Sequence, residues 1–76
     1  MPYDKERVGN RLAALRKDKG MTQEELAKAS GISLNSIARY EIGDTSMGLD
    51  AAYDLTAALG CTLDQLVCRN HFAPLA

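Results

Sequence analysis

The sequence contains few of the residues that build metal centres or disulfides. Its 76 residues include two cysteines, one histidine and no tryptophan. Cys61 and Cys68 are separated by a spacing that matches no common zinc motif, and His71 alone could not complete such a site. We therefore expect no metal or cofactor. We expect two reduced thiols in a cytoplasmic protein, with Cys61 as a small apolar filler of the core.

Long apolar runs and combinations of catalytic residues are also missing. No stretch approaches the roughly 18 apolar residues that a membrane span needs, and no apolar segment follows the first residues as in a signal peptide. We find no nucleophile–base pair, no paired carboxylates and no glycine-rich phosphate loop. We therefore expect neither an enzyme nor a small-molecule site. With one Phe and three Tyr, the core should be aliphatic.

Charge is nearly balanced overall but is divided unevenly along the chain. The net charge of −1 argues against indiscriminate binding to nucleic acid. Residues 1–40 carry eight Lys/Arg against five acids, whereas residues 41–76 carry one Arg against five acids. Such a division is typical of a protein with one anion-facing side, although scatter among so few charges can also produce it.

Apolar spacing and capping residues predict five helices and no strand. The first should run from Asp4 to about Asp18, with Gly20 as its stop. Thr22 should begin the second helix, because Glu25 three residues later completes a capping box. Gly31 should end the second helix, and Ser33 should begin the third. A fourth helix is marked by Leu49, Ala52, Leu55 and Leu59 and should end at Gly60. Thr62 should begin a short fifth helix with Leu63, Leu66 and Val67 along one side. Residues 43–48 form the longest loop. We assign 1–69 to one domain and 70–76 to a C-terminal tail.

The second and third expected helices are spaced as a helix-turn-helix. Two short helices that cross closely need a small residue at the crossing, which Ala27 supplies, and a turn residue that tolerates positive φ, which Gly31 supplies. Ile37 and Tyr40 should anchor the third helix from behind. A polar helix held by one face and exposed on the other suits the DNA major groove. Its outward residues should be Ser33, Leu34, Asn35, Ala38 and Arg39.

The chain resembles the lambda repressor–Cro family of helix-turn-helix proteins. The likeness rests on the segments TQEELA (22–27), GIS (31–33), SI (36–37), YEIG (40–43), ALG (58–60) and LDQL (63–66). It covers about residues 7–67. The resemblance implies an all-α, five-helix DNA-binding domain, usually dimeric, that regulates transcription, often as a repressor. Its partner would be a double-stranded DNA operator.

The resemblance also implies roles for particular residues. Those matching the base-reading surface are Ser33, Leu34, Asn35 and Arg39. Those matching phosphate contacts are Thr22, Gln23, Ser36 and the backbone at Gly43. Arg16 and Glu41 match a structural ion pair, with phosphate contact as an alternative for Arg16. Arg suits guanine, Asn suits adenine, and Leu can contact a thymine methyl.

Other features leave alternatives open. Asp44 stands where many relatives carry Lys or Arg, and an acid there should repel phosphate. Lys17 and Lys19 fit either a solvated helix end or phosphate contacts. A homodimer through the fifth helix and C-terminal region would cover the apolar residues Leu66, Val67, Phe72 and Leu75. A different hypothesis is a protein-interaction module, antitoxin-like or an adaptor, on the same scaffold with weak or no DNA binding.

Overall fold

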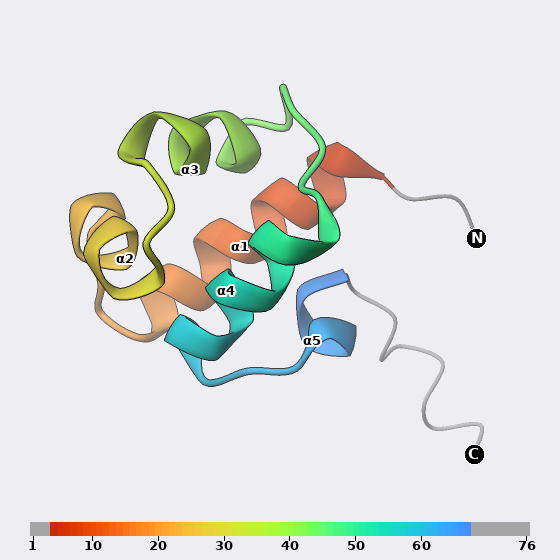
Figure 1. Cartoon of the computed structure of the whole chain (residues 1–76). Helices are drawn as coiled ribbons and strands as arrows, with labels where there is room; N and C mark the ends of the chain where they lie inside the picture. Colours follow the sequence, from red (N-terminus) through yellow and green to blue (C-terminus); the bar gives the residue numbers. More distant parts are fainter. Residues whose placement is uncertain (1–3, 68–76) are drawn as a thin grey trace, which may run out of the picture.

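Five α-helices joined by short connections make up the part of the chain that the structure describes (Figure 1). The structure is a computed structural model, and it describes residues 4–67. Within that range there is no strand, as the sequence predicted. The helices are α1 (Lys5–Asp18), α2 (Gln23–Ser30), α3 (Leu34–Glu41), α4 (Leu49–Leu59) and α5 (Leu63–Val67). The predicted boundary between residues 69 and 70 lies outside the described residues.

Short-range hydrogen bonds begin the helices where the sequence predicted. At the start of α2 the Thr22 hydroxyl accepts from the Glu25 N–H at 3.0 Å, and the Thr22 N–H donates to Glu25 Oε1 at 2.8 Å. The Ser33 hydroxyl likewise accepts from the Ser36 N–H at the start of α3. Gly31, with φ of 78°, ends α2 in the left-handed conformation that glycine adopts without strain. The expected capping box and glycine stop are therefore confirmed.

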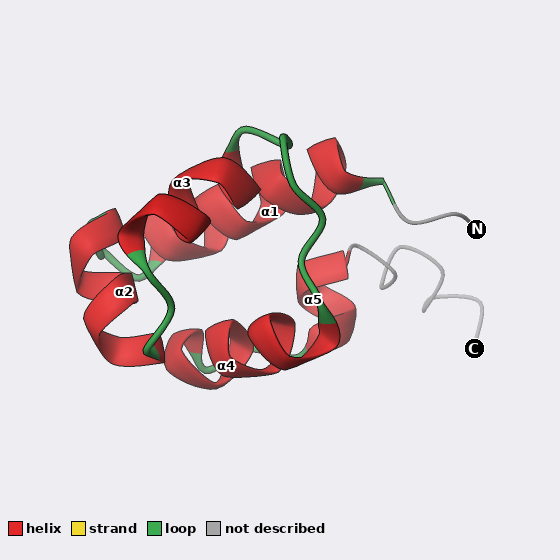
Figure 2. Ribbon diagram, turned by 45° about the horizontal axis from the view of Figure 1, so that its top comes forward, coloured by secondary structure: helices red, strands yellow, loops and turns green. Residues whose placement is uncertain are grey.

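The core draws one fully buried aliphatic side chain from each helix. These residues are Leu12, Leu26, Ile37, Leu55 and Leu66. α1 packs against α3 and α5, α2 packs against α3 and α4, and α4 packs against α5. Figure 2 shows α2 and α5 at opposite ends of the α1–α4 arrangement. Burying each of these side chains stabilises the fold by about 1.5–3 kcal/mol.

Two apolar residues differ in their burial. Leu49 begins α4, as the sequence predicted, and its side chain is 74% exposed. Leu66 was assigned partly to an apolar surface left for a partner, but it is fully buried. α5 packs against both α1 and α4, and this contact covers Leu66 completely.

Gly9 allows α1 and α3 to approach each other closely. A Cβ atom at this position would lie 2.1 Å from the backbone oxygen of Tyr40 and 3.0 Å from that of Glu41. The last turn of α3 therefore rests directly on the backbone of α1. A glycine inside a helix was the available sequence signal, but its partner could not be identified from spacing. Gly9 thus sets the position of the helix proposed to read DNA.

Candidate nucleic-acid interface

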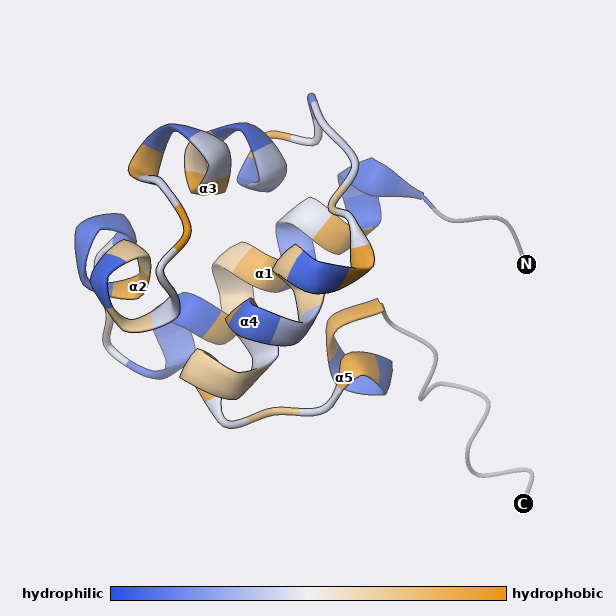
Figure 3. Cartoon of the chain, viewed as in Figure 1, coloured by the Kyte–Doolittle hydropathy of each residue, from blue (hydrophilic) through white to orange (hydrophobic). Residues whose placement is uncertain are grey.

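Helix α3 is attached to the domain by one face and exposed on the other. Ile37 is fully buried, and Tyr40 and Ala27 pack partly buried against the core. Figure 1 shows α3 along the outer edge of the molecule, and Figure 3 shows its outer side to be largely hydrophilic. The predicted base-contacting residues Ser33, Leu34, Asn35 and Arg39 are all exposed. The structure thus brings these four side chains together on the accessible side of α3 and its N-cap, Ser33.

A buried carboxylate joins α3 to α1 and α2. Glu41 accepts from Arg16 Nε at 2.6 Å and Nη2 at 3.0 Å, and from Gln23 Nε2 at 2.9 Å. The Arg16 and Glu41 side chains are only 11% and 7% exposed. Arg16 Nη1 also donates to the Met21 carbonyl at 2.8 Å. All three guanidinium nitrogens therefore donate hydrogen bonds within the domain. This argues against the alternative role of Arg16 as a phosphate contact.

The surroundings of Arg16 and of Cys61 shift the pKa of each side chain. The hydrogen bonds to Glu41 raise the pKa of Arg16, burial opposes that shift, and the charge of Glu41 adds to it. Arg16 stays charged at any physiological pH. Burial raises the pKa of the Cys61 thiol, with smaller opposing effects from nearby cations. Cys61 is partly buried against the core, as a small apolar filler would be, whereas Cys68 and His71 lie outside the described residues.

The predicted phosphate contacts have other partners in this structure. The side chain of Gln23 donates to Glu41, and Thr22 is part of the α2 capping box. Ser36 receives a hydrogen bond from the Ser33 hydroxyl at 2.9 Å. Gly43 is buried, with φ of 79°, and its N–H donates to the Tyr40 carbonyl. The structure places Gly43 in the turn after α3, and its expected role as a backbone phosphate contact stays a prediction.

A second ion pair within residues 4–67 lies on the exposed side of α3. Arg39 Nε donates to Asp44 Oδ2 at 3.1 Å, and the two side chains are 53% and 51% exposed. The backbone N–H of Asp44 also donates to the Arg39 carbonyl at 3.1 Å. Sequence spacing missed this pair because Asp44 follows Arg39 by five residues, beyond the end of the helix. The turn after α3 creates the contact.

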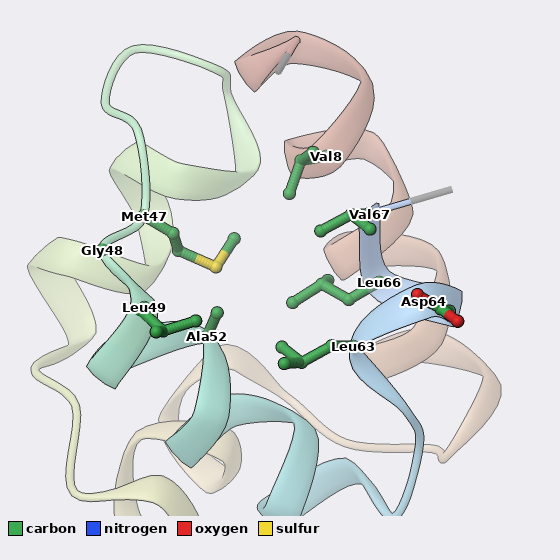
Figure 4. A pocket seen from close by; sticks show the side chains of 9 residues that line it. All are labelled: Val8, Met47, Gly48, Leu49, Ala52, Leu63, Asp64, Leu66 and Val67. Carbon is green, nitrogen blue, oxygen red and sulfur yellow. The ribbon is translucent and has the colours of Figure 1, made fainter. Parts of the chain in front are cut away.

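An apolar groove lies on another part of the surface, between the start of α4 and α5 (Figure 4). Its volume is about 360 Å³, and its lining includes Val8, Leu49, Leu63 and Val67. Leu63 and Val67 are half-buried, so each still exposes apolar surface. Phe72 and Leu75, which the sequence assigns to the same apolar surface, lie outside the described residues.

Among residues 4–67, no group of three His, Cys, Asp or Glu side chains could hold a metal ion. None of the five described helices is both long enough and apolar enough to cross a bilayer.

Comparison with known proteins places the chain in a family. Residues 12–66 match the family model described as "Helix-turn-helix". The chain is 36% identical over 67 residues to an uncharacterized HTH-type transcriptional regulator, y4dJ, from Sinorhizobium fredii, a match that covers 88% of this chain and 87% of the relative. It is 42% identical over 43 residues to the antitoxin PezA of Streptococcus pneumoniae, covering 57% of this chain and 27% of PezA.

A solved structure of another protein is similar to this chain in fold and in sequence. The restriction-modification controller protein C.AhdI from Aeromonas hydrophila superposes with a TM-score of 0.80 at 33% sequence identity, covering 83% of this chain and 96% of that one. The expected all-α fold with a helix-turn-helix at α2 and α3 is therefore confirmed. The chain belongs to the helix-turn-helix family of DNA-binding transcriptional regulators, which is not a family of enzymes.

Proposed function

We propose that this protein is a small dimeric repressor that binds a specific, roughly palindromic DNA operator in the cytoplasm. The supporting observation is the orientation of α3. The side chain of Ile37 is buried in the core, and those of Leu34, Asn35 and Arg39 are exposed to solvent. These side chains can contact a thymine methyl, adenine and guanine respectively in the major groove. Repression is the simpler outcome, because occupying DNA that overlaps a promoter requires no further contact with the transcription machinery.

Phosphate contacts would set the register of the domain on the duplex. Thr22 and Gln23, at the N-terminus of α2, Ser36 and the backbone at Gly43 remain our candidates for this role. The backbone amides there and the positive end of the helix dipole favour an anion. With Arg16 buried and Arg39 paired, at most about three to five phosphates should be neutralised per subunit. The plot of log K against log salt should therefore have a shallow slope, and a slope near −10 per subunit would contradict this contact count.

The dimer would form over the groove between α4 and α5. Leu49 exposes most of its side chain beside this groove, and a two-fold axis there would let two copies cover the same patch. The two α3 helices would then have to lie about 34 Å apart to enter successive major grooves. Leu49→Glu should shift sedimentation equilibrium to the monomer without unfolding the domain. Tyr53→Glu, at an equally exposed α4 position outside the groove lining, is the matched control.

Selection of bound sequences from a random DNA pool tests sequence-specific binding directly. We expect one enriched, roughly palindromic site. Arg39→Ala should weaken binding to that site by about 1–3 kcal/mol and relax the preference at one base position. Arg7→Ala removes the same charge from the exposed surface of α1 and should leave the base preference unchanged. If Arg39→Ala binds every site as the wild type does, Arg39 does not read a base.

A second function is favoured by one comparison. The similarity to the antitoxin PezA and the acidic residues 41–76 suit a protein-interaction module on the same scaffold. That function predicts a stable complex with a different protein. It would replace the operator-binding proposal if the random pool yielded no enriched sequence while such a complex was isolated.

A further inference from the structure

We propose that Asp44 is a specificity-determining residue, which orients Arg39 towards a base edge and keeps it from contacting phosphate indiscriminately. This inference rests on the proposed function, because it assumes that Arg39 reads a base. It assigns a role to an acid whose expected effect was only to repel DNA. The supporting feature is the ion pair between the two residues. They are joined by a hydrogen bond between their side chains and by another between their backbones.

The geometry of the pair leaves one edge of the guanidinium available. Asp44 accepts from Nε of Arg39 at 3.1 Å, and Nε carries one of the five guanidinium N–H groups. The terminal edge formed by Nη1 and Nη2 can make the two parallel hydrogen bonds that guanine O6 and N7 accept. An Arg side chain has many rotamers, and fixing Nε restricts the directions in which the terminal edge can point. Asp44 can therefore orient Arg39 while Arg39 binds a base.

Asp44 is itself held in place by the backbone. Its N–H donates to the carbonyl of Arg39 at 3.1 Å, within the turn that follows α3. Gly43 shapes this turn with φ of 79° and is buried against Glu6, whose Cα atom would lie 2.9 Å from a Cβ at position 43. The carboxylate thus projects from a turn anchored on α1. Its contact with Arg39 does not depend on a freely moving loop.

The exposure of the pair determines its effect on binding. Exposed ion pairs are weak, equivalent to about fivefold or less in an equilibrium constant, so Asp44 cannot prevent Arg39 from reaching a good partner. At the operator, Arg39 can keep Asp44 on Nε and gain a guanine on its terminal edge. On random DNA, the acid offsets the charge of Arg39 and so weakens the attraction of Arg39 to phosphate. The pair therefore lowers non-specific affinity more than specific affinity.

The test compares two substitutions that separate charge from orientation. Asp44→Asn removes the charge but retains a side-chain oxygen that can accept from Arg39, whereas Asp44→Ala removes both. Asp54→Asn removes the same charge from an exposed position on α4 and serves as the control. Each protein is titrated with the selected operator, with single-position variants of it and with random duplex DNA, at several salt concentrations.

For Asp44→Asn we expect binding to random DNA to tighten by about three- to tenfold, with a salt slope steeper by about one per subunit. Asp44→Ala should show the same gain and should also lose about two- to fivefold of the discrimination at the base that Arg39 reads. Asp54→Asn should change neither quantity. If both Asp44 variants keep the wild-type ratio of specific to random binding, the inference is wrong.

A double-mutant cycle tests whether Asp44 acts through Arg39. In the Arg39→Ala background, Asp44→Ala should no longer change base discrimination, and most of the gain on random DNA from Asp44→Asn should disappear. An undiminished gain would show that the acid acts on phosphate directly, which would overturn the proposed mechanism. These results are distinguishable from failure of the proposed function, because in that case the random pool would yield no operator to titrate.

Discussion

Removing the carboxylate of Glu41 should destabilise the fold far more than removing that of Asp44, although both acids pair with an arginine. Glu41→Ala deletes the acceptor of three hydrogen bonds, two from Arg16 and one from Gln23. It leaves the Arg16 guanidinium, whose side chain is only 11% exposed, with the Met21 carbonyl as its remaining acceptor. An uncompensated charge in such a position is costly because water cannot solvate it fully.

The expected magnitude is about 3–5 kcal/mol, the cost of breaking a buried ion pair on one side. A domain of this size has a total stability of roughly 4–11 kcal/mol, so the loss should lower Tm by about 15–30 °C. Asp44→Ala should cost about 1 kcal/mol or less, because its pair is half exposed to solvent. Replacing both buried partners, as in Arg16→Met with Glu41→Leu, should recover most of the stability.

Urea and thermal unfolding, followed by far-UV circular dichroism, would measure these differences. The double variant shows whether the loss in free energy of unfolding arises from the unpaired charge of Arg16 or from the lost packing of the Glu41 side chain. If Glu41→Ala does not fold, Glu41→Gln provides a folded variant. If Glu41→Ala destabilises the domain no more than Asp44→Ala does, the Arg16–Glu41 pair does not hold α1 and α3 together as argued.

Two further predictions concern stability. Gly9→Ala should destabilise the domain by about 1–3 kcal/mol despite the better helix propensity of alanine, because its Cβ would lie 2.1 Å from the Tyr40 oxygen. Gly48→Ala, where a Cβ meets nothing within 4 Å, should cost only about 0.5 kcal/mol in the same urea titration, because Gly48 is the N-cap of α4 and alanine caps less well than glycine. Thr22→Ala should cost about 1 kcal/mol by removing the α2 cap, and an unchanged unfolding midpoint would show that the capping box adds no stability.

The exposure of the proposed site residues on α3 could be predicted from the sequence because it follows from helical period and anchoring. Once Ile37 faces the core, Asn35 and Arg39 must face away from it. The intramolecular partners of Gln23 and Gly43 could not be predicted in the same way. These partners, Glu41 and Tyr40, belong to the end of α3, and only the packing of the helices decides which groups they meet.

The sequence by itself determined where the helices begin and end, because caps and glycine stops are hydrogen bonds and φ angles within about four residues. The Thr22–Glu25 capping box and the left-handed Gly31 are of this kind. Only the tertiary structure decided which side chains meet across the domain. The fit of Gly9 against α3 and the burial of Arg16 with Glu41 depend on how the helices cross, and no local pattern encodes such contacts between distant residues.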